Sequence, residues 1–397
     1  MNMNTFGRNF RVQIFGESHG EAIGVVVDGV KAGIPLAKED FSKDILRRKS
    51  GAKGTTPRIE ADEPEILSGV FEGHTTGAPI AIIFRNTNTK SSDYKELLDV
   101  PRPGHADWTS SVKWNGFNDP RGGGHFSGRL TLPLVAAGVI AKKQCGFSFH
   151  ADLVEIGGET DKDRWPDLLD ATAKEGDSLG GIVECHVDGV PAGLGEPFFD
   201  SVESLISHAV FSIPGVRGIE FGDGFAAARL KGSEHNDSLT CPGTSLMAEA
   251  SSGGPTASPC SESPVANDSE LASGLASPDR SHPRLVRGRG PLAERVGGAE
   301  RSEESGLSEP DASFEVVLPK KNGAGGVNGG ITNGAPIVFR VAFKPTSSIA
   351  KAQKTLNIKT GEMTELKIKG RHDVCFALRT PVIIEAVAAI VLADQSL

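Results

Sequence analysis

Three histidines lie in short segments that are rich in glycine. These segments are "GESHG", "RPGHAD" and "GGGHFSG", and they contain His19, His105 and His125. Imidazole titrates near neutral pH and acts as a general acid or base, and loops held by a neighbouring strand often carry catalytic groups. Glycine explains the turns, but turning does not require Glu17 or Ser18 beside His19. The segments therefore predict acid–base chemistry, with a structural histidine as the alternative at each single position.

A second set of residues has the side chains needed to bind anions. Residues 46–58, "LRRKSGAKGTTPR", hold five basic side chains around a glycine-rich turn. A helix end that favours cations explains one or two of these charges, whereas five predict a clamp for phosphate and carboxylate groups. Ser127 and Arg129 lie just ahead of a predicted helix and add a candidate anion site. Residues 370–382, "GRHDVCFALRTPV", bring further basic, imidazole and acidic groups together.

The composition limits the classes of protein that fit. The net charge of -9 gives no general basic field for nucleic acid. The longest apolar runs, residues 130–141 and 381–393, are too short to cross a bilayer, so we expect no membrane partner. Five cysteines without a CxxC pair predict a reduced, cytoplasmic protein. Metal-ligand spacing, GxGxxG and Walker A motifs are absent from the sequence, so we expect no metal site.

The elements that must position these groups follow from hydrophobic periodicity. Strands are predicted at residues 10–18, 24–30, 78–86, 180–190 and 335–345. Helices are predicted at residues 37–50, 129–146 and 380–395, and residues 201–222 are predicted to form a helix, a turn and a strand. Residues 87–108 are predicted to be a long polar loop. These patterns alone indicate a mixture of α and β structure.

Residues 238–320 differ from the rest of the chain. Phe314 is their single aromatic residue, and Ser, Gly and Pro make up 30 of the 70 residues from 241 to 310. Such a segment buries too little apolar surface to offset its ordering entropy. We therefore predict one catalytic domain made of residues 1–237 and 321–397, interrupted by a disordered, low-complexity insertion at 238–320.

Seven motifs together resemble one known family. They are "FGESHG", "RPGHAD", "RGGGHFSGR", "KGSEHND", "GGVNGGITNG", "FKPTSS" and "GRHDVCFALRTPV". They resemble, in the same order, the motifs of the chorismate synthases, and the resemblance covers the chain apart from the insertion. It implies an α+β fold of the β-α-β sandwich type, assembled as a homotetramer.

The resemblance also implies an activity. Chorismate synthases are carbon–oxygen lyases acting on phosphates, at the last common step of the shikimate pathway to aromatic amino acids. Their substrate, 5-enolpyruvylshikimate 3-phosphate, loses phosphate and a proton in an anti-1,4-elimination that gives chorismate. Reduced FMN is required although no net redox change occurs. A substrate with a phosphate and two carboxylates needs a basic clamp, and the elimination needs acid–base groups.

Roles for individual residues follow from the resemblance. His19 would protonate or stabilise the reduced flavin, His105 would assist phosphate departure, and Asp373 would act near flavin N5 in proton transfer. Binding of substrate or of the NADP phosphate is assigned to Arg48, Lys53 and Arg129, where Lys53 stands near a position that is often arginine in the family. Contacts with FMN are assigned to His125, Phe126, Ser127, Pro214, Gly215, Gly329, Lys344, Pro345, Thr346, Ser347, Ser348 and Arg371.

Two other classes of function remain open from the sequence. One is a flavin reductase that uses the cofactor for net electron transfer, and the other is a non-catalytic interaction protein that works through the insertion. The arginines of the substrate clamp speak against the first, and the intact His19, His105 and Asp373 speak against the second. The sequence does not indicate whether the chain reduces its own FMN or what the insertion binds.

Overall fold

Alternating buried side chains form a first antiparallel sheet. The computed structural model describes residues 4–56, 60–87, 99–239, 319, 321–368 and 372–396. The sheet has the strand order β1-β2-β3-β7-β4. Ile80, Ile82 and Phe84 on β7 are fully buried and alternate with more exposed residues, which is the period of a strand with one face on a core. The strands are β1 (Thr5–Phe6), β2 (Arg11–Gly16), β3 (Ala22–Asp28), β4 (Glu65–Ile66) and β7 (Ile80–Arg85).

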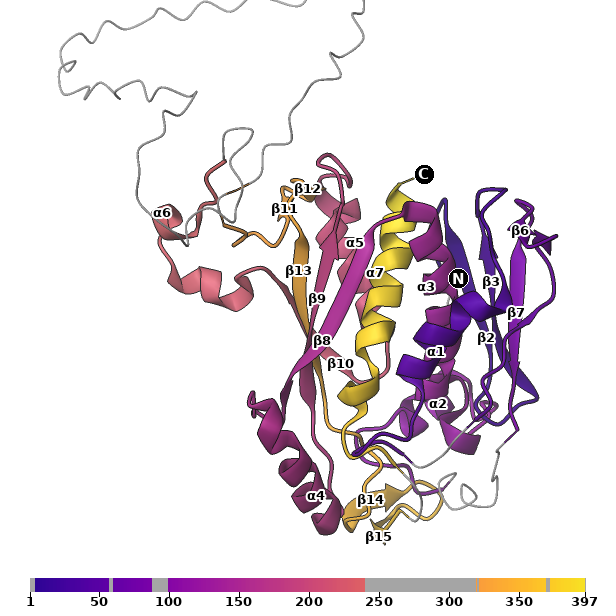
Figure 1. Ribbon diagram of the computed structural model, residues 1–397. Coiled ribbons are helices and arrows are strands. Elements are labelled where there is room, and N and C mark those ends of the chain that lie inside the picture. Colours follow the sequence, from indigo (N-terminus) through magenta and orange to yellow (C-terminus); the bar gives the residue numbers. More distant parts are fainter. Residues whose placement is uncertain are drawn as a thin grey trace, which may run out of the picture. The chain divides into compact units, whose positions relative to one another are not determined.

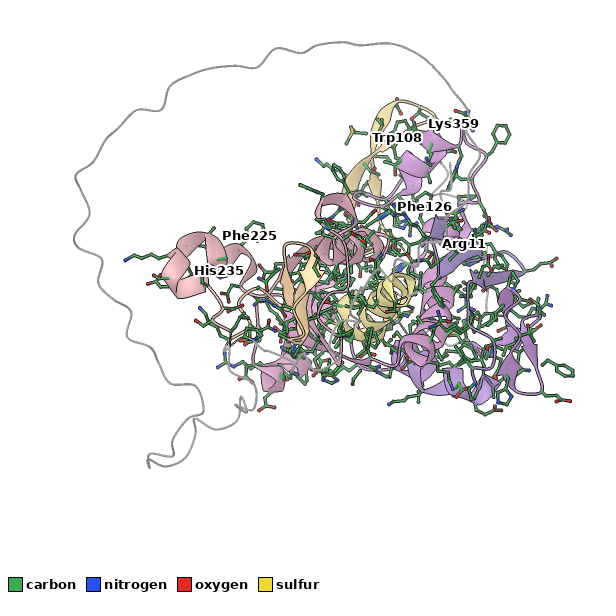
Figure 2. The ribbon with its side chains drawn as sticks, turned by 90° about the horizontal axis from the view of Figure 1, so that it is seen from above. Arg11, Trp108, Phe126, Phe225, His235 and Lys359 are labelled. Carbon is green, nitrogen blue, oxygen red and sulfur yellow. The ribbon has the colours of Figure 1, made fainter. Side chains whose placement is uncertain are left out.

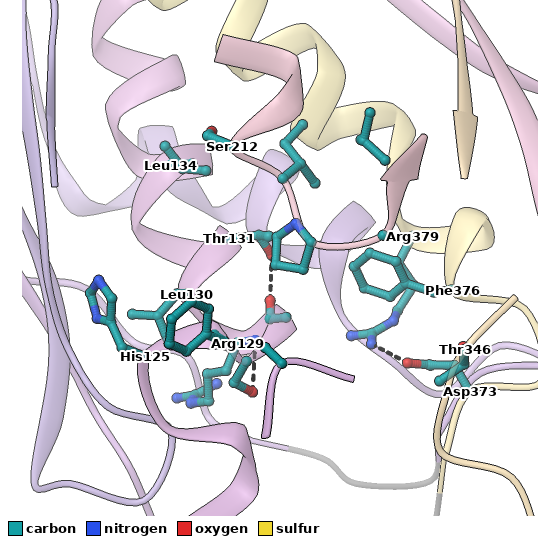
Figure 3. Close-up of a pocket in the computed structure, with 18 of the residues that line it drawn as sticks. His125, Arg129, Leu130, Thr131, Leu134, Ser212, Thr346, Asp373, Phe376 and Arg379 are labelled. Carbon is teal, nitrogen blue, oxygen red and sulfur yellow. Dashed lines mark hydrogen bonds and ion pairs between the residues drawn. The ribbon is translucent and has the colours of Figure 1, made fainter. Parts of the chain in front are cut away.

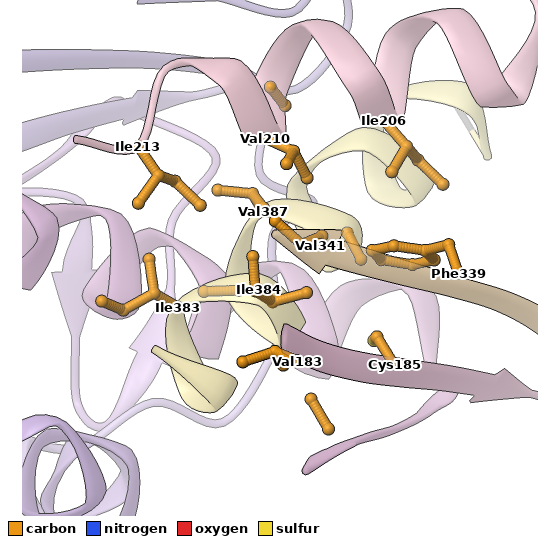
Figure 4. Close-up of a cluster of buried hydrophobic side chains, with 14 of the residues drawn as sticks. Val183, Cys185, Ile206, Val210, Ile213, Phe339, Val341, Ile383, Ile384 and Val387 are labelled. Carbon is orange, nitrogen blue, oxygen red and sulfur yellow. The ribbon is translucent and has the colours of Figure 1, made fainter. Parts of the chain in front are cut away.

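A second antiparallel sheet is built in the same way. Its order is β10-β13-β9-β8, and its strands are β8 (Ser148–Ile156), β9 (Gly181–Asp188), β10 (Val216–Phe221) and β13 (Ile337–Phe343). Val183 and Val187 on β9 and Phe339 and Val341 on β13 lie in its core with the end of α5 (Val202–Phe211) (Figure 4). Because β13 pairs along its length with β9, the chain after residue 321 completes a sheet begun before residue 190.

Two helices fill the layer between the sheets. They are α3 (Thr131–Cys145) and α7 (Pro381–Gln395), and almost every residue of α7 is buried, as expected of a helix that is covered on all sides. Gly138 on α3 lies against Ala386 on α7, so the two helices approach closely. Figure 1 shows the sheet, helix, sheet order of the layers. The expected α+β fold of the β-α-β sandwich type is confirmed.

Shorter elements surround the sandwich. Helix α1 (Ser42–Arg48) packs on α3, and α2 (Asp107–Lys113) and α4 (Trp165–Glu175) lie outside the helix layer. Figures 1 and 2 show α6 (Gly232–His235) and the preceding turn, with Phe225, projecting from the second sheet. The hairpins are β5 (Val70–Phe71) with β6 (His74–Thr75), β11 (Val327–Asn328) with β12 (Ile331–Thr332), and β14 (Gln353–Asn357) with β15 (Glu362–Leu366).

The predicted strands and helices are present, and the structure adds elements that were not predicted, among them helix α4. Strand β8 was not predicted; its burial alternates from Ser148 to Leu153, and a register shift between Leu153 and Glu155 then breaks the alternation. Strands β14 and β15 were not predicted because they are mostly polar and half-exposed. The predicted polar loop ends earlier than expected, since α2 begins at Asp107; its residues 88–98 lie outside the described part of the chain.

The flanks of the predicted insertion meet. Leu239 and Pro319 pair as an antiparallel bridge, and both belong to the unit that contains the sandwich. Residues 240–318 and 320 lie outside the described residues, and the prediction of disorder falls on them. Where the structure describes the chain, no helix has both the length and the apolar character needed to cross a bilayer.

Candidate active site

A cavity of about 1050 Å³ lies at one end of the helix layer. Its walls come from segments that are distant in sequence: the end of α1, the loop before α2, the glycine-rich turn before α3, the α5–β10 connection and the segments that follow β13 and precede α7. Figure 3 shows Arg129, Leu130 and Thr131 at the start of α3 on one side, and Arg379 with Asp373 on the other. The sandwich thus brings the predicted motifs of both halves of the chain to one place.

The cavity is positively charged although the chain is acidic. Its described lining holds seven arginine or lysine residues and three acidic residues, Glu60, Asp62 and Asp373. The whole chain has a net charge of -9. A local excess of cations in a concave site concentrates anions there. The cations are Arg48, Lys49, Arg102, Arg129, Arg217, Lys344 and Arg379.

Two arginines share one carboxylate in the floor of the cavity. Arg48, the last residue of α1, donates from Nη2 to Asp62 Oδ2 at 3.0 Å, and Arg129 donates from Nη1 to Asp62 Oδ1 at 2.7 Å. All three side chains are at least 94% buried. Burial lowers the pKa of Arg48 to about 10, so it stays charged at neutral pH. Burial acts to raise the pKa of Asp62, but the two arginines outweigh it and the pKa is lowered.

Three buried guanidinium nitrogens lack a hydrogen-bond partner within the described structure. They are Arg48 Nε, Arg129 Nη2 and Arg379 Nε. Buried donors are almost always satisfied, because an unsatisfied one costs about 1–3 kcal/mol, more when it is charged. Since the three arginines line the same cavity, an anionic ligand bound there would supply acceptors for these donors.

His105 lies in a network of charged groups on the cavity wall. Its Nδ1 is 2.7 Å from Asp107 Oδ1 and 3.0 Å from Arg102 Nη2. Arg102 in turn donates to both carboxylate oxygens of Asp107. Burial lowers the pKa of His105, Arg102 and Lys344 lower it further, and Asp107 only partly opposes them. The imidazole is therefore held in place and is poised to lose its proton more easily than a free histidine.

The glycine run before α3 separates the predicted histidines. Gly122 has φ +61°, and a Cβ atom on it would lie 2.2 Å from His19 Nδ1. Gly123 has φ +82°, and a Cβ atom on it would lie 3.3 Å from His105 Cε1. Gly122 lines the cavity, whereas His19 is buried behind it and does not. Only glycine permits this backbone conformation and this close approach to both rings.

Asp373 is held on both of its oxygens. Oδ2 accepts from Arg379 Nη2 at 2.6 Å, and Oδ1 accepts from the backbone N–H of Thr56 at 2.8 Å. Val374 and Cys375 also donate to the carbonyl of Gly54. These contacts join the segment before α7 to the basic loop after α1, so Asp373 is fixed at the cavity wall.

The predicted FMN residues fall into three groups. Most of them line this cavity: His125, Phe126, Ser127, Pro214, Gly215, Lys344, Pro345, Thr346, Ser347 and Ser348. Gly329 does not, because it lies in the turn between β11 and β12, away from the described lining. Arg371 lies outside the described residues.

His125 makes local contacts with both ring nitrogens. Nδ1 is 2.8 Å from the carbonyl of Gly16, and Nε2 is 3.1 Å from Asn4 Oδ1. The ring therefore ties the glycine-rich turn to the end of β2. Phe126 packs on Trp114, with ring centroids 5.1 Å apart, and Ser127 accepts from the backbone of Arg129. At these positions the backbone is better placed than the imidazole to meet a ligand.

The structure does not bring Lys53 to the cavity. Its Nζ pairs with Asp170 on α4 at 2.8 Å, and both side chains are about half exposed. The turn that follows α1 directs Lys53 outward, whereas Lys49 lines the cavity. The placement of Lys53 in the anion clamp is therefore corrected.

Two carboxylates that hold predicted site residues in place were not themselves predicted as site residues. Asp62 lies in "EADEPE", an acidic run that is typical of a solvated loop, and no sequence pattern links it to Arg48 and Arg129. Asp107 stands two residues after His105, and this spacing is the one pattern that could have indicated the pair. Across the described ranges, no three His, Cys, Asp or Glu side chains gather in a way that could hold a metal ion.

Comparison with known proteins gives one consistent family. The family model described as chorismate synthase matches residues 10–266 and 288–397. A chorismate synthase of Chitinophaga pinensis is 52% identical over 394 residues, covering 99% of this chain and 96% of the relative. A chorismate synthase of Korarchaeum cryptofilum is 39% identical over 423 residues, covering 100% and 98%.

A solved structure is similar as well. A crystal structure of chorismate synthase aligns with a TM-score of 0.61 at 25% sequence identity. The alignment covers 98% of this chain and 92% of the other. Sequence and fold comparisons therefore agree over nearly the whole length of the chain.

Proposed function

Because the chain belongs to the chorismate synthase family, lyases of aromatic amino acid biosynthesis, we propose that its cavity converts 5-enolpyruvylshikimate 3-phosphate to chorismate. The reaction is an anti-1,4-elimination of phosphate at the last common step of the shikimate pathway, with reduced FMN and no net redox change. The observation that carries the proposal is the cluster of buried arginines with unpartnered N–H groups in a cationic cavity. A substrate with one phosphate and two carboxylates supplies the anions that this cluster lacks.

Arg48 and Arg129 bind the substrate. Asp62 holds both guanidinium groups through one carboxylate, so they are fixed in place before a ligand binds. Planar guanidinium groups suit carboxylate and phosphate, because two parallel N–H bonds match two oxygens. Arg379 adds a third cation beside Asp373.

His105 and Asp373 move the protons. The elimination breaks a carbon–oxygen bond to phosphate and removes a carbon-bound proton, and the electron pair of that C–H bond ends in the new double bond of the ring. His105, when protonated, donates to the departing phosphate and lowers the charge that develops on it. Asp373 takes part in removal of the carbon-bound proton, and Arg379 stabilises its carboxylate until then.

The cavity suits FMN. Its volume of about 1050 Å³ exceeds that of an ordinary small-molecule site, as binding a cofactor and a substrate together requires. Thr346 Oγ1 is buried and has no hydrogen-bond partner within the described structure, and it belongs to the segment Lys344–Ser348 assigned to FMN. Bound there in reduced form, FMN supplies electron density that favours loss of phosphate. Gly122 lies between His19 and the cavity, so any effect of His19 on the flavin is indirect and passes through the backbone at Gly122.

Assembly and location complete the proposal. The protein forms a homotetramer in the cytoplasm, and Arg48 also serves the NADP phosphate where the chain reduces its own flavin. Phe198 and Phe199 are neighbours in the chain and are 86% and 92% exposed, and adjacent exposed apolar side chains suit a protein interface. The three free cysteines of the described structure, Cys145, Cys185 and Cys375, agree with a reducing compartment.

An anaerobic assay tests the proposed activity. The protein is mixed with chemically reduced FMN and 5-enolpyruvylshikimate 3-phosphate, and chorismate is followed by its absorbance. We expect chorismate and phosphate in equal amounts, with catalytic rather than stoichiometric flavin. Steady NADPH oxidation without chorismate would identify a flavin reductase instead. Absence of both activities would favour the interaction protein.

A further inference from the structure

We propose that Asp107 is a positioning residue for His105: its carboxylate holds Nδ1–H of the imidazole, which leaves Nε2 as the nitrogen that faces the cavity. The proposal rests on the proposed function only for what His105 does to the substrate. The geometry of the pair stands by itself, since Asp107 Oδ1 is 2.7 Å from His105 Nδ1.

The hydrogen-bond geometry determines which ring nitrogen carries the proton. Nδ1 of His105 has two close neighbours, Arg102 Nη2 at 3.0 Å and Asp107 Oδ1 at 2.7 Å. Arg102 Nη2 carries two N–H groups; one donates to Asp107 Oδ1 at 2.7 Å, and the other is directed at Nδ1. An unprotonated Nδ1 would direct its lone pair at a carboxylate oxygen, which is repulsive. Because the carboxylate oxygen is the nearer neighbour and carries the negative charge, we assign the tautomer in which a protonated Nδ1 donates to it.

Asp107 is itself held firmly. It is the first residue of α2, where the helix dipole favours a negative charge. It accepts from the backbone N–H and from Nε of Arg102, at 3.1 and 2.7 Å. Arg102 is anchored at its far end by a bond from Nη1 to Ser348 Oγ at 2.9 Å. Asp107 therefore has little freedom to rotate, and the imidazole that it binds is fixed with it.

Nε2 is the ring nitrogen of His105 that Asp107 leaves for a ligand. The backbone of Gly123 covers the ring edge, since a Cβ atom there would lie 3.5 Å from Nε2 and 3.3 Å from Cε1. His105 lines the cavity, so Nε2 is the nitrogen available to a bound phosphate. A histidine held by a carboxylate on one nitrogen and acting through the other is a general arrangement for acid–base catalysis.

The charges around His105 give Asp107 a second effect. Arg102 on its own loop, Lys344 after β13 and His372 before α7 face the imidazole and oppose its protonation. Asp107 is the carboxylate that favours the protonated form. Loss of this charge leaves the three cationic or titratable groups unopposed, so the imidazolium becomes harder to form.

The experiment compares Asp107→Asn, Asp107→Ala and a control, Asp152→Asn. Asp152 pairs with His150 at 3.0 Å on the exposed surface of β8, so the control removes the same group from a histidine pair outside the site. Ring-nitrogen NMR shifts of His105, assigned by the peak missing in His105→Ala, report the tautomer and the pKa. The pH dependence of kcat/KM reports the effect on turnover.

Wild-type protein should show His105 with Nδ1 protonated in the neutral form. Asp107→Asn keeps an acceptor oxygen, so the tautomer should persist while the pKa of His105 and the alkaline limb of kcat/KM both fall by about one pH unit. Asp107→Ala should lose the tautomer preference and lower kcat/KM by at least about tenfold. Asp152→Asn should change neither.

A wild-type His105 with Nε2 protonated in its neutral form would overturn the proposal without any variant. So would an Asp107→Asn protein that melts like the wild type, yet keeps the His105 pKa and the pH limb unchanged. Absence of chorismate formation by the wild type would instead refute the proposed function, because the NMR result does not depend on turnover.

Discussion

The protonation of a single residue, His105, depends on two opposing sets of charges. Burial, Arg102 and Lys344 lower its pKa in the free protein, and a phosphate dianion bound beside it would raise the pKa again. The same residue can therefore be mostly neutral before substrate binds and protonated in the complex. This property suits a group that must donate a proton to a departing phosphate.

Replacing His105 with alanine should slow turnover by about 10²–10⁴, the usual contribution of a positioned acid or base. Flavin affinity should change little, because the proposed role is at the phosphate. The measurement is the anaerobic assay together with a flavin titration by fluorescence. Wild-type turnover in the variant would remove His105 from the mechanism.

In the wild type, kcat should fall at a higher pH than kcat/KM. Activity needs the imidazolium, so each profile should fall as pH rises through the pKa of His105. For kcat/KM this pKa is that of the free protein and lies below 6.5, whereas for kcat it belongs to the complex and lies higher. Coincident limbs, or a kcat limb at lower pH, would contradict this assignment.

The site residues predicted from the sequence agree with the structure at most positions and differ at Lys53. His105, Asp373, Arg48 and Arg129 were predicted from local composition, and the fold brings them to one cavity. Lys53 was placed in the clamp because it belongs to a basic cluster and stands near a position that is often arginine in the family, but the path of the turn decides where it points. Such contacts are set by tertiary structure, which composition does not encode locally.

Two buried helices, α3 and α7, carry the site. Helix α3 begins two residues after Arg129, and α7 begins two residues after Arg379, so the spacing of the helices sets the spacing of the arginines. Apolar periodicity predicted both helices. Strand β8 was not predicted: its alternation runs only to Leu153, where a register shift interrupts it.

Replacing Gly138 with alanine should destabilise the protein although alanine favours a helix by about 1 kcal/mol. A Cβ atom at Gly138 would lie 2.3 Å from Ala386 Cβ and 2.5 Å from its Cα, so the helices must move apart. Overpacking of this kind costs about 1–3 kcal/mol. A thermal melt should therefore show a lower Tm.

The pair Gly138→Ala with Ala386→Gly is the matched control. It moves one methyl group from α7 to α3 across the same contact, and part of the lost stability should return. An unchanged Tm in the single variant would show that the two helices can separate at no cost.

The insertion is the largest feature by which this chain departs from one continuous domain. Replacing residues 241–318 with a short Gly/Ser linker should leave a folded protein that binds FMN, because the flanking Leu239 and Pro319 already lie side by side. Loop-closure entropy grows slowly with length, so the shorter loop should stabilise by only about 2 kcal/mol. Melts with and without FMN, and the anaerobic assay, measure the outcome. Loss of folding or of flavin binding would show that the insertion packs on the rest of the chain.

In the proposed mechanism the substrate reacts in one cavity, at the end lined by Arg48, Asp62 and Arg129. The most direct test is a crystal structure with 5-enolpyruvylshikimate 3-phosphate and oxidised FMN. We predict substrate density inside this cavity, with phosphate or carboxylate oxygens within hydrogen-bond distance of Arg48 and Arg129. Substrate bound instead beside Lys53 and Asp170, with none in the cavity, would contradict the assignment of this cavity as the active site.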